Sequence, residues 1–457
     1  MTEALNPNPS PFSQDALAFA QQQDANPLFA AIREQGLAEF AEMPFPTRKT
    51  EDWKYTNLRA LTQANFNQGA TQFDVADLES AQATYEVAEL DAIRLVFVNG
   101  AFAAELSDDV ENSGLSLVQF SDANDEQKAI IEARLAKTCV TDRNLFTALN
   151  NGFANEGLFI HVEKNQRIEQ PIQVVNLSTP QATEATVFAR HLIVLENHAE
   201  ATVIEQFVST AETQNTVVNQ VSEVVLADGA KLNHYRLHTE DESAIHLGAL
   251  HVDLNRDSQF ESYQLALGSK IKRLDIVVNH NQSGSHCEMA GVYLPKNEQQ
   301  VDFHTYIEHK AAHCTTNEVY RGIMADKSKA VFNGRIHIHP DAQKTLAELS
   351  NKNLLLSNKA EINTKPELEI YADDVRCAHG ATVAQLDEKA RFYLQSRGVS
   401  RQEAEVMLSF GFINELLDSM PIEALRHHLR PMLAQQFTSN KALTKHLLDE
   451  ALEAEEA

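Results

Sequence analysis

Residues 221–237 read VSEVVLADGAKLNHYRL, and this stretch shows the pattern that decides the fold. An apolar run over residues 221–226 leads into Asp228 and Gly229, and a second run follows in which apolar and polar side chains alternate. Asp and Gly are residue types that accept the backbone angles of tight turns. The stretch therefore predicts two short strands joined by a tight turn.

Runs of the same kind, rich in Val, Ile, Phe and Thr, recur across residues 157–380, and helical periodicity is nearly absent there. So long a stretch, with a strand about every ten residues, is typical of a β-sandwich, a barrel, a propeller or a β-solenoid. Turns of the form Asp-Gly-Ala-x-Leu, each followed by an apolar strand, favour the solenoid, in which successive coils stack and bury a continuous core. Because no strict repeat is legible, the residues alone also leave a double sandwich open.

The flanking segments are predicted to be helical. In the N-terminal segment, helical spacing of apolar residues ends at Pro44 and Pro46. A short strand that ends in a turn is expected at residues 95–100, and a helix at residues 125–151. We therefore expect a mostly helical domain over residues 1–125, a β core with a leading helix over residues 126–380, and a helical domain over residues 381–457.

Helical spacing returns near the C-terminus. Two residue pairs match the capping box that starts a helix, Thr382 with Gln385 and Ser400 with Glu403. Gly398, between the two pairs, predicts the end of the first of these helices.

Two prolines and an acidic tail follow these helices. Pro421 suits the first position of a third helix, and Pro431 is expected to interrupt that helix. The acidic, Ala-rich residues 449–457 are expected to form a solvated tail.

The composition excludes several classes of function. The chain has 457 residues, of which 38 are basic and 65 acidic, and its formal net charge is -27. Nucleic acids and anionic membranes both attract basic surfaces, so neither is an expected partner. The N-terminus lacks the basic and apolar regions of a secretory signal, and no stretch reaches the apolar length that a membrane span needs. A cytoplasmic protein is expected.

Cysteine usage points to a reducing compartment. The chain has 4 cysteines, and no two of them form a C-x-x-C pair. This argues against a disulfide framework, a zinc ribbon and a self-contained ferredoxin-type cluster. The four positions are Cys139, Cys287, Cys314 and Cys377.

Cys377 and His379 lie in the run ADDVRCAHGAT at residues 372–382. In an extended segment their side chains share one face, because strand side chains alternate with period two. Thiolate and imidazole are ligands that suit iron–sulfur clusters and borderline-soft metals. From spacing alone, however, such a histidine is more often a hydrogen-bonding residue, and a free cysteine is as often a small buried packing residue.

Other histidines also stand close together. His309, His313 and Cys314 form a H-x3-H-C run, but the histidines would share a face only on a helix, and the region is predicted to be β. His337 and His339 alternate onto one face of a strand, and a solvent-facing pair is the interpretation that we favour.

An enzymatic role is not expected. The sequence has no G-x-S-x-G elbow, no Walker A lysine loop and no G-x-G-x-x-G run after a strand. A carbohydrate-active enzyme is the alternative of this class, because parallel β-helices often host such enzymes. Aromatic residues make up only 7% of the chain and no carboxylate pair stands out, which argues against it.

The flanks of Cys377 and His379 resemble those of the SufD family, a component of the Suf iron–sulfur cluster assembly machinery. Upstream is the run KPELEIY at residues 365–371, and downstream is FYLQSRG at residues 392–398. Residues 346–353 depart from the family's usual pattern, which weakens any argument from that stretch. Further motifs similar to the family's landmarks follow in family order at residues 46–56, 96–100, 268–275, 301–309, 320–323, 331–336, 342–345 and 353–357.

The resemblance implies a mainly β fold with a right-handed parallel β-helix core, flanked by α-helical N- and C-terminal domains. It also implies a complex in which a SufB-like protein pairs with this chain through the β-helix, and a SufC-like ATPase docks on the C-terminal helical domain. The nascent iron–sulfur cluster would form at the interface with SufB and be shared transiently, so the isolated chain would hold no tightly bound cofactor. His379 matches the family's interface histidine and is the expected metal ligand, and Cys377 is the second candidate ligand of the cluster.

The function expected on this basis is that of a non-catalytic scaffold subunit, which couples nascent cluster assembly to the ATPase. The alternative is a purely structural partner that stabilises the SufB-like protein and activates the ATPase without binding the cluster. In isolation, the unpaired strand edges of a β-helix also leave a homodimer open.

Overall fold

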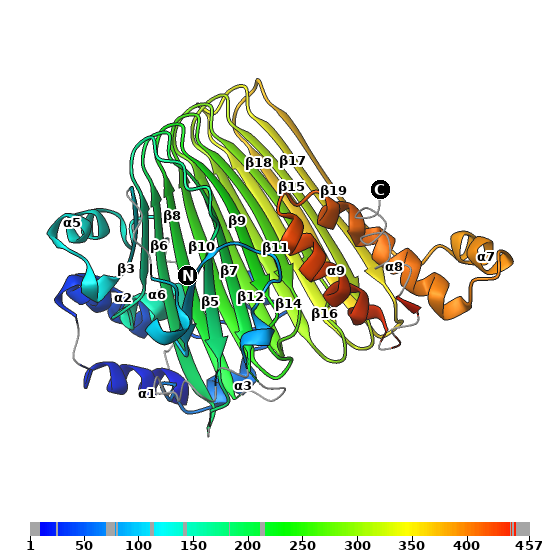
Figure 1. The fold of residues 1–457 in the computed structure, drawn as a ribbon, viewed down its shortest axis with the longest axis horizontal. Helices are drawn as coiled ribbons and strands as arrows, with labels where there is room; N and C mark the ends of the chain where they lie inside the picture. Colours follow the sequence, from blue (N-terminus) through cyan, green and yellow to red (C-terminus); the bar gives the residue numbers. More distant parts are fainter. Residues whose placement is uncertain are drawn as a thin grey trace, which may run out of the picture.

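The structure is a computed structural model that describes residues 10–23, 26–69, 78, 81–109, 114–139, 144–181, 183–210, 215–438, 440, 443 and 444. The solvated tail predicted at residues 449–457 lies outside these described residues. Figure 1 shows a long stack of strands at the centre of the molecule, with helices from both ends of the chain lying outside the stack.

Two parallel sheets form the stack. From β4 onward, successive strands go to alternate sheets, so each strand from β6 to β17 pairs with the strands two places before and after it. The first sheet contains β5 (Ile172–Ser178), β7 (Glu200–Ser209), β9 (Lys231–His238), β11 (Gln259–Ala266), β13 (His286–Tyr293), β15 (Thr315–Met324), β17 (Leu346–Leu355) and β19 (Arg376–Ala384). The second contains β4 (Leu158–Val162), β6 (Ala185–Leu195), β8 (Thr216–Leu226), β10 (Ile245–Leu254), β12 (Ile271–His280), β14 (Gln300–His309), β16 (Lys329–Ile338) and β18 (Glu361–Ile370). The predicted parallel β-solenoid is confirmed.

The interior of the solenoid is filled by side chains that stack in columns, one residue per coil. In the second sheet, Val224, Val252, Val278, Ile307 and Ile336 are register partners along successive strands. All of them are fully buried. Because parallel strands keep a constant register, the alternation within each strand turns the same face inward in every coil. A continuous core therefore forms although the sequence shows no strict repeat.

One corner of the solenoid repeats a left-handed backbone conformation. Gly229, in the turn between β8 and β9, has φ +69°, a conformation that favours glycine. Positive φ recurs at the equivalent corners of five other coils, and each of these residues precedes a small buried side chain. The predicted Asp-Gly turn is thus one case of a corner that recurs at His198, Asp257, Gly284, His313 and Lys344.

The N-terminal segment contributes both strands and helices. β1 (Ile93–Val98) extends the first sheet beside β5, β2 (Ala101–Phe102) pairs antiparallel with β1, and β3 (Leu115–Gln119) pairs antiparallel with β4. The strand predicted at residues 95–100 is thereby confirmed. The helices are α1 (Pro11–Ala20), α2 (Ala30–Glu42), α3 (Arg59–Gln63), α5 (Asp125–Arg134) and α6 (Leu145–Gly152), with short 3-10 helices at Pro27–Phe29, Glu51–Trp53, Gln82–Thr84, Ala104–Leu106 and Phe120–Asp122.

The N-terminal helices cover the outer face of the second sheet. Leu145 and Phe146 of α6 pack with Val217 and Leu247 of the sheet in one buried cluster. The single helix predicted at residues 125–151 is two helices, because the backbone becomes extended at Leu135 after α5.

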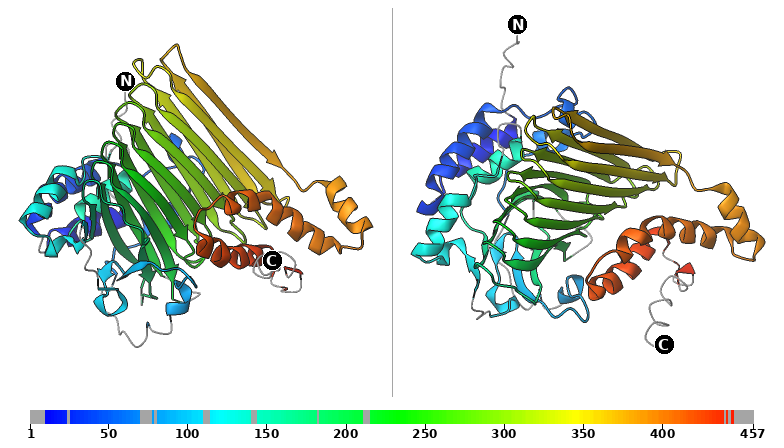
Figure 2. Two further views of the ribbon diagram at one scale, coloured as in Figure 1. Left: turned by 45° about the horizontal axis from the view of Figure 1, so that its top comes forward. Right: turned by 90° about the horizontal axis from the view of Figure 1, so that it is seen from above.

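In the part of the chain that the structure describes, three helices follow the solenoid: α7 (Glu388–Ser396), α8 (Arg401–Asp418) and α9 (Glu423–Phe437). α8 and α9 pack on the outer face of the first sheet, where Phe410, Ile413 and Leu425 share a buried cluster with Leu265 and Ile323 of the strands. α7 has no buried residue. Figure 2 shows it projecting away from the sheets.

The predicted starts of these helices are right in one case and wrong in another. Ser400 caps α8 by accepting a hydrogen bond from the backbone of Glu403, and Gly398, with φ +93°, follows the end of α7. Thr382, in contrast, is a strand residue of β19, which runs to Ala384. Pairing with Lys352 of β17 outweighs the local capping pattern, and α7 starts instead after its N-cap Asp387.

Both proline predictions for the third helix are wrong. α9 begins at Glu423, after Pro421, and it continues through Pro431. Leu429 and Leu433, on either side of this proline, are buried. Their packing against the first sheet outweighs the cost of the lost helical hydrogen bond.

Candidate functional site

Cys377 and His379 lie on β19, the last strand of the first sheet. Cys377 is the register partner of Ala347, and His379 is the register partner of Leu349. Ala347 and Leu349 belong to the solenoid interior. Because strand side chains alternate, Cys377 and His379 share one face, as predicted, and that face continues the interior of the solenoid.

Cys377 is half-buried and packs against the interior core cluster. Burial raises the pKa of its thiol, although a backbone hydrogen bond from Ala347 acts in the opposite direction. Because of this raised pKa, the thiol stays protonated until a metal or a partner lowers its pKa. Only the thiolate form binds metals. In this structure Cys377 therefore packs as a small, partly buried residue.

His379 is exposed because its coil is the last one. β18 and β19 end the two sheets, so each has an edge that pairs with no other strand among the described residues. Figure 1 shows these two strands at the end of the stack that is remote from the N-terminal helices. Such edges present rows of N–H and C=O groups to which another chain can pair.

Large apolar side chains are also exposed at this open end. Ile370, Tyr371 and Val383 are 42%, 61% and 49% exposed. In the preceding coil, Ile338 is the register partner of Ile370 and is fully buried. Ile370 and Val383 are therefore side chains of a solenoid core that lacks its next layer, and exposed apolar groups of this kind are typical of an interaction surface.

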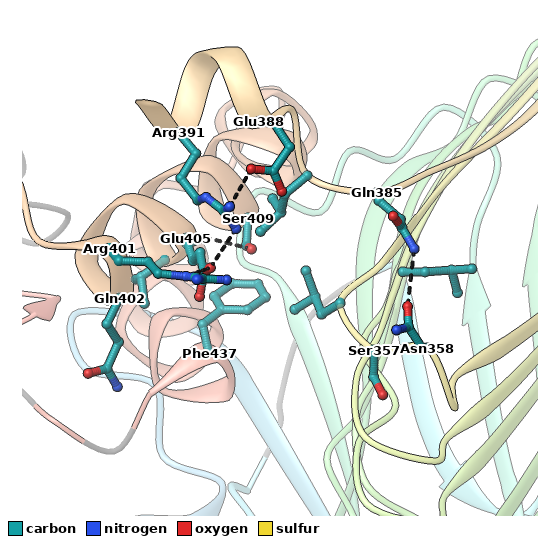
Figure 3. Close-up of a pocket in the computed structure, with 14 residues that line it drawn as sticks. Ser357, Asn358, Gln385, Glu388, Arg391, Arg401, Gln402, Glu405, Ser409 and Phe437 are labelled. Atoms are coloured by element: carbon teal, nitrogen blue, oxygen red, sulfur yellow. Dashed lines mark hydrogen bonds and ion pairs between the residues drawn. The ribbon is translucent and has the colours of Figure 1, made fainter. Parts of the chain in front are cut away.

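The C-terminal helices present a second exposed apolar surface. Phe392 and Tyr393 on α7 are 72% and 54% exposed. Figure 3 shows how the base of α7 is held: Arg391 contacts Glu388 and lies 3.0 Å from Oε1 of Glu405 on α8. The apolar side chains of α7 are thus carried on an anchored helix.

Three of the sequence motifs meet in one buried cluster. The guanidinium of Arg273 lies 4.4 Å from the ring centroid of Trp53, and its Nη1 donates a 2.6 Å hydrogen bond to the backbone carbonyl of Asp52. It also lies 2.9 Å from Oδ2 of Asp302. The motifs at residues 46–56, 268–275 and 301–309 therefore fix the N-terminal segment onto the second sheet.

His309 pairs with a residue of another coil. Its ring stacks on that of His280 with centroids 4.3 Å apart, and the hydroxyl of Thr316 lies within 3.0 Å of Nε2 of both rings. Burial lowers the pKa of both histidines, that of His309 to about 3, so both are neutral. Cys314 lies beside them, whereas His313 does not join this group, as its β context predicted.

His337 and His339 share a face of the sheet, as predicted. The interpretation as a solvent-facing pair holds only in part, because their side chains are 19% and 36% exposed. Both rings contact the carboxylate of Glu308 on the neighbouring strand β14.

Sequence reasoning missed a set of charged residues inside the solenoid. Glu205 is fully buried and lies 2.7 Å from Nδ1 of His191 and 2.9 Å from Nε2 of His234. Burial alone would raise the pKa of Glu205, but Arg236 and the two histidines hold it well below its usual range. Glu240 makes a similar cluster with His246 and Lys272. The sequence contained one indication that Glu205 is buried. Glu205 lies two residues after the inward-facing Val203 in β7, so the alternation of strand side chains also turns Glu205 inward.

Taken together, these features define a class of protein: a parallel β-solenoid with one open end, a Cys-x-His strand on that end and anchored helices beside it. Comparison with known proteins identifies the family. The SufBD protein N-terminal region matches residues 14–174, and the SufBD core domain of SUF system FeS cluster assembly matches residues 177–412.

Two relatives called iron–sulfur cluster assembly protein SufD are similar over most of the chain. The protein from Escherichia coli (strain K12) is 32% identical over 405 residues, which cover 88% of this chain and 92% of the relative. The one from Bacillus subtilis (strain 168) is 28% identical over 87% of this chain and 91% of the relative. SufB of Bacillus subtilis is 23% identical over 77% of this chain and 74% of its own length. The chain belongs to the SufD family, within the SufBD proteins of the SUF iron–sulfur cluster assembly system.

A membrane-spanning helix was not expected. Among the described residues, no helix has both the length and the apolar character needed to cross a membrane.

Proposed function

We propose that this protein is a non-catalytic, cytoplasmic scaffold subunit that pairs with a SufB-like protein through its open solenoid end and helps to hold the nascent iron–sulfur cluster there. The observation that carries this proposal is the uncapped last coil, on which Cys377 and His379 share a face. A partner that pairs with β18 or β19 would cover the apolar side chains of this end and enclose His379.

The ligand types suit a cluster that is cargo rather than a resident cofactor. Thiolates bind iron–sulfur clusters tightly, whereas an imidazole is weaker and can be displaced by a proton. A single histidine cannot hold a cluster, so the remaining ligands would come from the partner, with Cys377 as the additional thiol of this chain. Burial raises the pKa of Cys377, which keeps this thiol protonated until iron arrives.

The C-terminal helices offer a route for coupling to a SufC-like ATPase. The exposed Phe392 and Tyr393 of α7 would provide the apolar docking surface. Arg321 of β15 connects the helices to the sheet, because it donates a 2.7 Å hydrogen bond to the backbone carbonyl of Phe412 and contacts Glu415, both on α8. A displacement of the helices would therefore act directly on the first sheet.

The test compares His379→Ala with the native chain in co-purification with SufB-like and SufC-like partners, followed by anaerobic loading with iron and sulfide. His286→Ala is the matched control, because His286 is also partly exposed but lies on β13, inside the stack. We expect all three complexes to assemble and only His379→Ala to lose most of the cluster absorbance.

Equal loading of the His379→Ala complex would contradict the ligand role. If Cys377→Ala also loads normally, the protein is a structural partner that stabilises the SufB-like subunit without binding the cluster. Failure of the native chain to form any complex would contradict the scaffold proposal itself.

A further inference from the structure

The outer face of the second sheet carries a second group of side chains of metal-ligating types, centred on β14 and β16 beside the last strand β18. Glu308, His337 and Glu369 are register partners on β14, β16 and β18, so they form one column on this face. His339 follows two residues after His337 and therefore comes to the same side. The constant register of the solenoid thus brings two histidines and carboxylates together from separate coils.

Two imidazoles converge on one carboxylate oxygen. Nδ1 of His337 lies 2.7 Å from Oε2 of Glu308, and Nε2 of His339 lies 2.8 Å from the same oxygen. The ligand atoms of the three side chains all lie within 4.8 Å of one another. The set is therefore compact enough for one ion to contact all three side chains.

Neighbouring side chains hold this arrangement in place. Arg335 contacts Glu308 through Oε1, at 3.5 Å, which leaves Oε2 to the histidines. Arg335 is itself fixed by two 2.9 Å hydrogen bonds to the carboxylate of Glu369. The ring of Tyr371 packs edge-on against His337, with centroids 5.4 Å apart. Such support orients metal ligands before the metal binds.

The site is also reachable from solvent. The side chains of Glu308, His337 and His339 are 20%, 19% and 36% exposed. This distinguishes the group from His280, His309 and Cys314, which are fully buried. A bound ion would keep positions open for water or for a transferred ligand.

We propose that Glu308, His337 and His339 form a binding site for a divalent first-row transition-metal ion. Two imidazoles and one carboxylate are the ligand set of facial sites for ferrous iron, and similar sets bind zinc and cobalt. The ion would bind the lone pairs of His337 Nδ1 and His339 Nε2, so any proton on these atoms moves to the other ring nitrogen or is released.

Ferrous iron is the natural ion for such a site in a cluster assembly protein, and that choice rests on the proposed function. The existence of the metal site does not rest on the proposed function, because the site needs only Glu308, His337 and His339. The experiment therefore uses Co²⁺, whose visible absorption bands report its ligands, as the probe.

The test is a titration of the full chain with Co²⁺, followed by visible absorption and calorimetry. We expect one equivalent to bind, and we expect His337→Ala, His339→Ala and Glu308→Gln each to weaken binding by about tenfold or more. His286→Ala should bind Co²⁺ as the native chain does. Circular dichroism of each variant verifies that the solenoid is intact.

Two results would overturn the proposal: no saturable Co²⁺ binding by the native chain, or unchanged binding after both histidine substitutions. Loss of stability in the variants without Co²⁺ binding by the native chain would assign the three side chains a purely structural role. The test of the open end measures cluster loading of the complex with His379→Ala, so a failure of this site leaves that test unaffected.

Discussion

At the scale of single residues, the solenoid interior tolerates ionisable groups at a cost that depends on pH. Glu318 of β15 is fully buried between its register partners Met289 and Leu349. Burial raises its pKa from the usual 4.5 to about 7. Between these two pH values, Glu318 is protonated in the folded protein but ionised in the unfolded chain. The stabilising effect of this proton is complete below pH about 4.5 and is lost as the pH rises through about 7.

Glu318→Gln should remove this pH dependence. Relative to the native chain, this variant should gain about 2 to 3 kcal/mol of unfolding free energy between pH 5 and pH 8, because Gln has no proton to lose. Urea unfolding at the two pH values measures the change. Glu205→Gln is the control, since Glu205 is charged and paired in the folded state, and its loss should destabilise the protein at both pH values. A Glu318→Gln effect that is equal at both pH values would contradict the assignment.

Among the helices and strands, the sequence predicted correctly those features that interactions between neighbouring residues determine. The alternating runs predicted strands, Gly229 marked a turn, and Ser400 marked a helix start. The predictions from Thr382 and Pro431 were wrong. Thr382 pairs with β17 instead of starting a helix, and the packing of α9 on the first sheet outweighs the tendency of Pro431 to interrupt it. Those forces come from residues far away in the sequence.

The same limit applies to the candidate site. The period of two in a strand predicted that Cys377 and His379 share a face. It could not predict that His379 is exposed, since this depends on β19 being the last strand of its sheet. Nor could it connect Glu308 with His337, because their contact depends on the register between coils.

Helix α7 carries two exposed aromatic side chains, Phe392 and Tyr393. Replacing both Phe392 and Tyr393 with Ser should abolish binding of the SufC-like ATPase, because it removes the exposed apolar surface. The stability should change by only about 0.5 kcal/mol, since α7 has no buried residue. Pull-down of the ATPase and thermal unfolding measure the two effects. Tyr55→Ser is the control, because Tyr55 is 39% exposed and lies in the N-terminal segment. Undiminished ATPase binding by the double variant would place the docking surface elsewhere.

At the scale of the whole molecule, the two ends of the solenoid differ. At the first end, β1, β2 and β3 extend the sheets, and the N-terminal helices cover the outer face of the second sheet there. At the other end, β18 and β19 each have an edge that pairs with no strand in the described part of the chain, and Ile370, Tyr371 and Val383 are exposed. Such an edge can pair with another chain, and in a purified sample that chain would be a second copy of this protein.

The isolated chain is therefore expected to form a homodimer through β18 and β19, and Ile370→Asp should convert it to a monomer. The new carboxylate would have to be buried without a partner in the paired state, which is strongly unfavourable. Sedimentation velocity across a concentration series measures the change in mass. Leu346→Asp is the matched control, because Leu346 is also 42% exposed but lies on β17, one coil before β19 in the same sheet. A native chain that stays monomeric, or an Ile370→Asp variant that still dimerises, would show that the open end does not drive association. If the same surface also pairs with the SufB-like subunit, Ile370→Asp should weaken that complex as well, because one end cannot serve two partners at once.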